Sequence, residues 1–211
     1  MKGRNIVVTG GLGALGRGVV AVLEARGAQV IVAPDPPELD LGDEAAASAF
    51  FAGLPPLWGS VHLVGGFAMK PLVDTSLADF TQQWRTNTAT CFLSCREAVR
   101  AMRKAGGGGR IVNVAARPVV SPVGGMAAYA AAKAGVASLT QTLAVEFAGD
   151  RILVNAVLPS IIDSPANRKA MPEADHDAWP KPAEIAEAIA FLVSPENTLT
   201  TGTLLPVYGR A

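Results

Sequence analysis

The stretch Ile6–Gly18, IVVTGGLGALGRG, decides the fold of this chain. It begins with four β-branched residues, which favour a strand, and continues with five glycines within nine positions. From Leu15 onward, apolar side chains recur at the spacing of a helix, as far as Leu23. These patterns predict a strand, a tight turn and a helix near the start of the chain.

Three of the glycines, Gly11, Gly13 and Gly16, fit the pattern G-x-G-x-x-G. In this pattern the glycines permit the sharp turn, allow the backbone to approach a pyrophosphate, and let the helix pack closely on its strand. The amides and the positive end of the helix then face the phosphates. Because the pattern directly follows a strand, it favours dinucleotide binding over a turn that is only structural.

The composition is typical of one α/β domain with a buried sheet. Of the 211 residues, 50% are hydrophobic and only 17% are charged. The 18 basic residues balance the 18 acidic ones, so nothing predicts a nucleic-acid partner. The first apolar run breaks at Gly10, too early for a signal peptide, and no run approaches the roughly 18 residues of a membrane span. We therefore expect a cytoplasmic protein that binds neither nucleic acid nor membrane.

Neither the cysteines nor the histidines have the spacing of a metal site. Cys91 and Cys95 are four residues apart on an expected helix, without a CxxC pattern or a nearby histidine in the sequence, and His62 and His176 lie far apart. We interpret the cysteines as reduced thiols packed on a helix face, and we expect no metal.

Strands and helices alternate along the rest of the chain. Apolar runs predict further strands at 29–33, 61–64, 110–115, 151–158 and 203–207. Helices are expected at 43–53, 76–104, 126–147 and 183–193, and Ser76 with Asp79 forms a capping box that opens the second of these. The alternation predicts a doubly wound, mostly parallel sheet.

An acidic residue follows the second strand, where a dinucleotide site needs one. Asp35 lies about 20 residues beyond the glycines, and a carboxylate there accepts hydrogen bonds from ribose hydroxyls and repels a 2′-phosphate. We therefore expect NAD(H) to be preferred, with NADP(H) not excluded. The alternative is a solvated aspartate in a turn of three prolines. Only a few residues separate this strand from Asp40-Leu41, so the usual intervening helix is missing. Gly65-Gly66 after a later strand would let the backbone lie beside a cofactor.

The segment at about 160–182 is a candidate substrate lid. It is rich in proline but keeps apolar anchors, among them Ile161, Met171 and Trp179. Arg168 and Lys169 in this segment would contact an anionic substrate or would simply be solvated.

Tyr129 and Lys133 carry the chemistry. Residues four apart lie on one face of a helix, so the phenol and the ammonium are neighbours. We expect the cation to lower the pKa of the phenol, which can then exchange a proton with a substrate oxygen or nitrogen.

At these residues the chain resembles the short-chain dehydrogenase/reductase family over nearly its whole length. The matching pieces are Thr9-Gly10 with the glycine turn, Asp40-Leu41, His62-Leu-Val-Gly65, Asn87, Asn113, Tyr129 with Lys133, and Asn155-Ala-Val-Leu-Pro159.

The resemblance implies a role for each matching residue. Tyr129 would be the catalytic acid/base, Lys133 would tune it and bind the nicotinamide ribose, and Asn87 would hold a water of the proton relay. The expected cofactor-binding residues are Gly10, Gly11, Leu12, Gly13, Ala14, Leu15, Asp35, Asp40, Leu41, Gly65, Gly66, Lys133, Pro159, Ile161 and Ser164.

We expect one Rossmann-type domain, residues 1–211, with a seven-stranded sheet in the order 3-2-1-4-5-6-7. The alanine-rich long helices would join copies into a homodimer or homotetramer.

Two departures from the family point to one branch. The catalytic serine of the family falls on Ala116, and the middle glycine of its turn falls on Ala14. Both features resemble the dihydropteridine reductases, as do Val64-Gly-Gly-Phe67 and the lid pieces Asp163-Ser-Pro165, Asn167-Arg-Lys169 and Met171-Pro-Glu-Ala-Asp175. Without the serine hydroxyl, substrates that are already electrophilic are favoured.

The sequence therefore predicts a reductase that transfers hydride to an electrophilic C=N or C=O group of a small molecule, such as a quinonoid dihydropterin. The candidate substrate contacts are Ala116, Phe67, Asn167 and Trp179, although Phe67 and Trp179 would equally suit the core. The alternatives are a carbonyl reductase with another substrate and a regulator that binds the dinucleotide without turnover.

Overall fold

The protein, a computed structural model that describes residues 1–210, is built on one parallel sheet. The strand order is β2-β1-β3-β4-β5-β6, and each pair of neighbours is parallel. The bounds are Asn5–Thr9 (β1), Gln29–Val32 (β2), Gly59–His62 (β3), Gly109–Val114 (β4), Ile152–Pro159 (β5) and Leu204–Val207 (β6). All carboxyl ends of the strands therefore lie at one edge, where ligands of such sheets bind.

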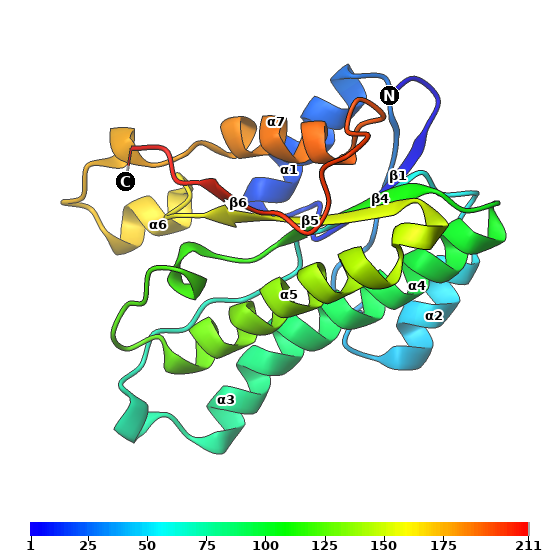
Figure 1. Ribbon diagram of the computed structural model, residues 1–211. Coiled ribbons are helices and arrows are strands. Elements are labelled where there is room, and N and C mark those ends of the chain that lie inside the picture. Colours follow the sequence, from blue (N-terminus) through cyan, green and yellow to red (C-terminus); the bar gives the residue numbers. More distant parts are fainter. Residues whose placement is uncertain (211) are drawn as a thin grey trace.

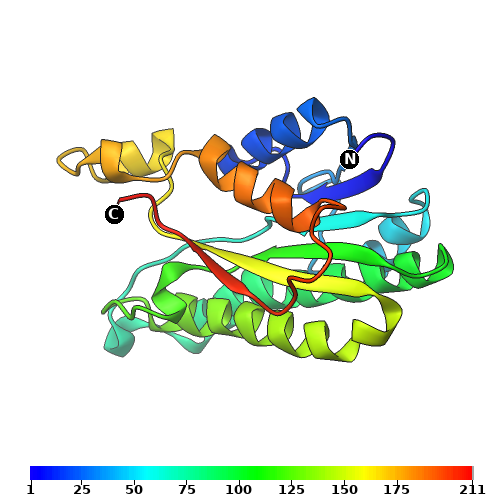
Figure 2. The ribbon, with the colours of Figure 1, turned by 45° about the horizontal axis from the view of Figure 1, so that its top comes forward.

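Helices cover both faces of the sheet (Figure 1). The helices α1 (Ala14–Ala25) and α7 (Pro182–Val193) pack on one face, and α2 (Glu44–Ala52), α4 (Thr90–Lys104) and α5 (Ala127–Glu146) pack on the other. The chain enters α4 through α3 (Leu77–Trp84), which lies against α5. The short α6 (Pro165–Ala170) stands apart from these layers, beyond the carboxyl edge of the sheet (Figures 1 and 2).

The alternating strand residues divide the core into two layers. Ile6 and Val8 of β1 pack with α1 and α7, whereas Val7 between them belongs to the cluster with α2, α4 and α5. All three side chains are fully buried. Burying a side chain of this size contributes about 1.5–3 kcal/mol, so the pattern of this one strand stabilises both layers.

The expectation of seven strands in the order 3-2-1-4-5-6-7 is wrong in its details. Among the described residues the sheet has six strands, and β2 is its edge. A crossover to a further parallel strand needs a dozen or more residues, but only residues 33–43 separate β2 from α2, and three of them are proline. This shortened connection brings Asp40 directly to the carboxyl edge.

Most of the expected helices and strands are present, with shifted ends. The capping box of Ser76 and Asp79 forms as predicted. The helix expected over 76–104 is instead divided, because a π-helical segment, Arg85–Ala89, separates α3 from α4. The strand expected at 61–64 ends at His62, which leaves Gly65 and Gly66 in the loop that follows.

None of the helices within residues 1–210 combines the length and the apolar character that crossing a membrane requires.

Candidate active site

The glycine turn between β1 and α1 has the geometry that a pyrophosphate site needs. A Cβ on Gly16 would lie 2.2 Å from the carbonyl oxygen of Gly10, so only glycine lets α1 pack this closely. Gly10 itself has a φ of +69°. The Cβ of a residue at Gly13 would meet nothing nearer than 3.4 Å. Gly13 is therefore not required by packing, and it is the N-cap of α1 without a side-chain cap.

The other residues expected at this turn are placed accordingly. Leu12 is exposed at the tip, and Ala14 and Leu15 begin α1, whose first amides have no intrahelical partner. The turn thus presents backbone donors to an anion, as the sequence predicts.

A cavity of about 280 Å³ lies beyond the end of β2. Asp35, Asp40 and Leu41 line it, as expected for the adenosine side of a dinucleotide site. The sequence interpretation missed Arg85, whose guanidinium is 2.7 Å from Asp40 Oδ2. Asp40 Oδ1 also accepts the amide of Gly42 at 2.8 Å, so this carboxylate is held by the protein, whereas Asp35 contributes a second carboxylate to the lining.

Asn87 lies in the π-helical segment at the centre of the carboxyl edge. Its side chain is buried, donates to the carbonyl oxygen of Gly66 at 3.0 Å and accepts the Gly66 amide at 3.2 Å. Its Nδ2 also donates to the carbonyl oxygen of Gln83 at 2.9 Å. Single-turn π segments are frequent at functional sites, and this one fixes Asn87 to the loop after β3.

Lys133 and Tyr129 lie on the face of α5 that meets the same loop. Lys133 Nζ donates to the carbonyl oxygen of Val114 at 2.9 Å, and a Cβ on Gly65 would lie 3.1 Å from Nζ and 2.8 Å from Asn87 Oδ1. Only glycine at position 65 leaves room for both polar groups. The structure therefore brings Lys133, Asn87 and Gly65 together, while Tyr129 is placed one helical turn before Lys133.

The protonation of this pair differs from our expectation. The pKa of Tyr129 is raised to about 12 by burial, and the pKa of Lys133 is lowered to about 8, also by burial. The prediction that Lys133 lowers the pKa of the phenol is wrong for the protein without ligand, because loss of solvent dominates at both groups. Tyr129 is thus a protonated acid at neutral pH.

The candidate substrate contacts divide into two groups. Phe67 lies at the site, and its ring packs edge-to-face on Tyr129 with centroids 5.0 Å apart. Ala116 is buried directly after β4, and its methyl group offers no hydrogen bond. Trp179 is buried against His176, and Asn167 Nδ2 donates to the carbonyl oxygen of Ile162 at 2.8 Å, so both hold the lid together.

The lid is more ordered than a proline-rich loop requires. Ser164 caps α6 by accepting the amide of Asn167 at 3.2 Å, and Ile161 is exposed between the end of β5 at Pro159 and this cap. Arg168 forms a two-pronged ion pair with Asp163, at 2.6 and 2.9 Å. This arginine is therefore engaged within the lid.

These residues fit a dinucleotide cofactor. The glycine turn supplies uncapped amides, the cavity after β2 supplies the carboxylate of Asp35, and Lys133 supplies an ammonium with three donors, one of which bonds to Val114. Thr9 lies directly before the turn, and its Oγ1 is buried without a hydrogen-bond partner. One buried polar atom at the carboxyl end of β1 therefore has no hydrogen bond to another group of the protein.

Comparison with known proteins agrees with this geometry. The family model described as enoyl-(acyl carrier protein) reductase matches residues 2–209. The chain is 31% identical to the cis-4-hydroxycyclohexanecarboxylate dehydrogenase of Sinomonas cyclohexanicum, over 98% of this chain and 95% of that protein. It is 27% identical to the levodione reductase of Leifsonia aquatica, over 98% and 93% of the two chains.

The fold also matches solved structures. The structure titled ElxO with NADP bound superposes with a TM-score of 0.90 over 99% of this chain and 98% of that one, at 24% identity. The relatives found support the family but not the dihydropteridine reductase branch. Because the family model spans nearly the whole sequence, the chain belongs to the short-chain dehydrogenase/reductase family and is an NAD(P)-dependent oxidoreductase.

Proposed function

We propose that this protein is an NADH-preferring reductase that transfers hydride to an electrophilic C=O or C=N bond, with Tyr129 as the proton donor. The observation that carries the proposal is the meeting of Lys133 and Asn87 at Gly65, with Tyr129 one helical turn before Lys133 on α5. The curated relatives are named as a reductase and as a dehydrogenase of a hydroxy carboxylate, which supports carbonyl and alcohol chemistry.

The protein's own groups prepare the site for reduction. The bound nicotinamide supplies a hydride. Tyr129 keeps its proton at neutral pH because its pKa is about 12, so it is ready to donate that proton to the oxygen or nitrogen on which negative charge develops. Lys133 binds and orients the ribose next to the nicotinamide, and Asn87 holds the loop that borders both groups.

Ala116 restricts the substrates that this site can reduce. A hydroxyl at that position would polarise a carbonyl, and its absence removes one hydrogen bond to the developing charge. Substrates that accept hydride without such help, such as quinonoid or iminium systems, are therefore preferred. Together with the similarity of the lid, this favours a quinonoid dihydropterin and a place in the dihydropteridine reductase-like branch.

The preference for NADH rests on the cavity at the end of β2. Its lining includes one cation, Arg85, which is paired with Asp40, and it also includes Asp35. A 2′-phosphate would meet a carboxylate and no unpaired cation among these described lining residues. ElxO, which shares this fold, was solved with NADP bound.

We also propose a homo-oligomer formed through the long helices. Phe92 on α4 and Val145 on α5 are exposed large apolar side chains, 44% and 80% accessible. Exposed apolar residues on one layer of a domain are typical of a surface that packs against a second copy.

One kinetic comparison tests the proposed activity. NADH oxidation is measured with a quinonoid dihydropterin and with simple diketones, for the wild type and for Tyr129→Phe. We expect turnover that falls at least about 100-fold in the variant, because the proton donor is lost while binding is retained. Binding of NADH without turnover of any substrate in either protein would instead identify a dinucleotide-binding regulator.

A further inference from the structure

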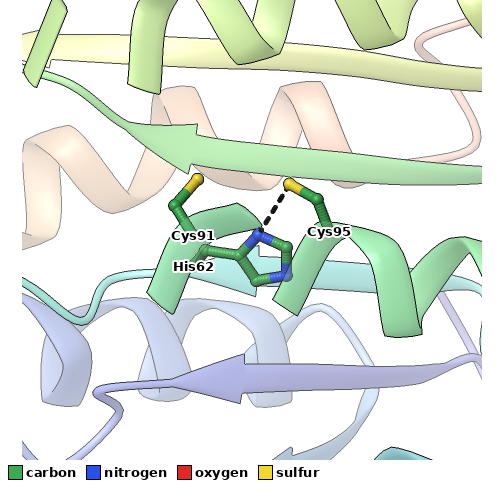
Figure 3. A group of neighbouring side chains, drawn as sticks. All are labelled: His62, Cys91 and Cys95. Atoms are coloured by element: carbon green, nitrogen blue, oxygen red, sulfur yellow. Dashed lines mark hydrogen bonds between the residues drawn. The ribbon is translucent and has the colours of Figure 1, made fainter. Parts of the chain in front are cut away.

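Three potential metal ligands that are distant in the sequence meet in the core. His62 ends β3, and Cys91 and Cys95 lie one turn apart on α4, with the thiol of Cys95 directed at the imidazole and that of Cys91 beside it (Figure 3). The two sulfurs and a ring nitrogen all lie within 4.8 Å of one another. The sequence interpretation, which assigned these cysteines no nearby histidine, missed the cluster because the fold brings β3 against α4.

We propose that His62, Cys91 and Cys95 bind one Zn²⁺ ion, with the side-chain oxygen of Asn113 as the fourth ligand. Asn113 Oδ1 lies 2.8 Å from His62 Nδ1 and 3.5 Å from Cys95 Sγ, so it points into the same small space. Two sulfurs, one imidazole nitrogen and one oxygen form a donor set that suits zinc, and two of these ligands are the soft thiolates that zinc shares with Cu(I).

The distances are close to those of a tetrahedral site. Zinc bonds of about 2.3 Å to sulfur and 2.0 Å to nitrogen place these two atoms about 3.5 Å apart in a tetrahedron. His62 Nδ1 and Cys95 Sγ are 3.5 Å apart. The pair of His62 and Asn113, at 2.8 Å, must open by about half an ångström to reach the corresponding separation of roughly 3.3 Å. Cys91 Sγ lies within 4.8 Å of the other sulfur and of the ring nitrogen, and a tetrahedral site brings it to roughly 3.5–3.8 Å from them.

The residues around the ligands support this coordination. In the structure His62 Nδ1 donates to Asn113 Oδ1 at 2.8 Å, because an amide oxygen only accepts, and Ser60 Oγ lies 2.7 Å from His62 Nε2. On metal binding the ring proton would move to Nε2, where Ser60 Oγ accepts it, and Nδ1 would become the ligand. Asn113 Nδ2 donates to Thr140 Oγ1 at 2.9 Å, which in turn donates to the carbonyl oxygen of Val136, and this chain keeps Oδ1 directed at the site.

Charge and protons balance on binding. Each cysteine loses its S–H proton to solvent as a zinc–sulfur bond forms, and the imidazole stays neutral as its proton moves from Nδ1 to Nε2. Two thiolates neutralise Zn²⁺, so the buried cluster carries no net charge, which burial requires. No oxidant or reductant takes part.

A disulfide fits the same cysteines poorly. Residues four apart on a helix have Cβ atoms about 5–6 Å apart, whereas a disulfide needs about 3.5–4.5 Å. Cys91 and Cys95 would have to unwind α4 to form a disulfide, but a metal ion bridges them without such a change.

The site is closed and therefore structural. His62, Cys91, Cys95 and Asn113 are at most 5% exposed, which leaves no open coordination position for a substrate. The ion would link β3 and β4 to α4. This position is next to the loop after β3, to which Asn87 is hydrogen-bonded. Because the donors are buried, the metal enters as the chain folds and leaves slowly.

Metal content tests the proposal in the whole protein. We expect chain produced in zinc-supplemented medium, and then dialysed against a chelator, to retain about one zinc per chain by mass spectrometry. Chain refolded with Co²⁺ should show the sulfur-to-cobalt charge-transfer and intense d–d bands of a tetrahedral site. The cobalt spectrum of the wild type decides the question even if variants fold poorly.

Variants locate the ion. Cys91→Ser and Cys95→Ser should each reduce the zinc content at least tenfold while the circular dichroism spectrum stays unchanged. His176→Asn, which changes the other histidine of the chain, should keep the zinc content of the wild type. Absence of zinc and of thiolate bands in the folded wild type, equal zinc in the double cysteine variant, or a Cys91–Cys95 disulfide in the isolated protein would overturn the proposal.

Discussion

The ring of Phe67 packs edge-to-face on the ring of Tyr129, with centroids 5.0 Å apart and an angle of 82° between the ring planes. Phe67 is itself 61% exposed, so it covers the phenol without belonging to the core. The high pKa of Tyr129 results from burial, and Phe67 is the cover that can be removed with the least effect on folding.

Removing this cover should lower the pKa of the phenol. In Phe67→Ala we expect the pKa of Tyr129 to fall from about 12 toward the ordinary value of about 10, because water reaches the ring. The titration is followed by phenolate absorbance in a Tyr208→Phe background, which leaves Tyr129 as the one tyrosine of the chain. Phe80→Ala, an exposed phenylalanine on α3, is the control. An unchanged pKa in Phe67→Ala would contradict this cause.

Lys133 should make stability depend on pH. Its pKa of about 8 in the folded protein lies below the ordinary 10.5, so between these values the unfolded chain binds a proton that the folded chain lacks, and stability rises with pH. The cost of burying the charge is fully present below pH 8 and amounts to about 3 kcal/mol. Lys133→Met should therefore be more stable than the wild type by up to about 3 kcal/mol at pH 7, with the gain shrinking toward pH 10.5.

Urea denaturation at pH 7 and pH 10 measures this difference. Lys104→Met, which removes an exposed lysine from α4, should show no such pH-dependent gain. If Lys133→Met and Lys104→Met change the free energy of unfolding equally at both pH values, burial does not disfavour the protonated form of Lys133.

The sequence predicts those parts of the site that depend on the spacing of residues within one strand, turn or helix. The glycine turn and the pair of Tyr129 and Lys133 follow from the periodicity of strands and helices, and in the structure the turn joins β1 to α1 while both side chains lie on α5. Contacts between distant segments are different. The packing of Phe67 on Tyr129 and the meeting of His62 with Cys95 depend on how loops and layers pack, and no spacing in the sequence encodes them.

The missing strand illustrates a second limit. Family resemblance implied seven strands, whereas the short, proline-rich connection after β2 leaves no room for the extra one. The length of this connection can be counted in the sequence, and it is shorter than a further parallel crossover requires. The π-helical segment at Asn87 was not predictable either, since the residues around it keep a regular helical pattern.

The glycines of the turn should separate folding from cofactor binding. Gly16→Ala places a methyl group 2.2 Å from the carbonyl oxygen of Gly10, so we expect a loss of about 1–3 kcal/mol or more in stability. Gly13→Ala has room for its methyl group and should fold normally, yet it should weaken dinucleotide binding at least about tenfold by blocking the approach of the phosphates. Thermal denaturation and NADH titration of both variants test this. Equal behaviour of the two variants in both assays would be inconsistent with separate roles.

Asp35 should set the cofactor preference. In Asp35→Asn the repulsion of a 2′-phosphate is reduced, so we expect the ratio of NADH to NADPH affinity to fall about tenfold, corresponding to about 1.4 kcal/mol. Glu38→Gln removes an exposed charge of the same loop that does not line the cavity, and it should leave the ratio unchanged. Isothermal titration with both cofactors gives the ratio. If NADPH binds the wild type as tightly as NADH, the assignment is wrong.

Oligomer formation should depend on the layer of long helices and not on the opposite face. Phe92 on α4 and Phe191 on α7 are similarly exposed, at 44% and 46%, but they lie on opposite sides of the sheet. If copies associate through α4 and α5, Phe92→Glu buries a charge in the interface and should shift the protein to monomers, because an unpaired buried carboxylate costs several kcal/mol. Phe191→Glu should leave the assembly intact. Sedimentation velocity of the wild type and both variants decides between the faces, and dissociation by the α7 variant alone would place the contact on the other layer.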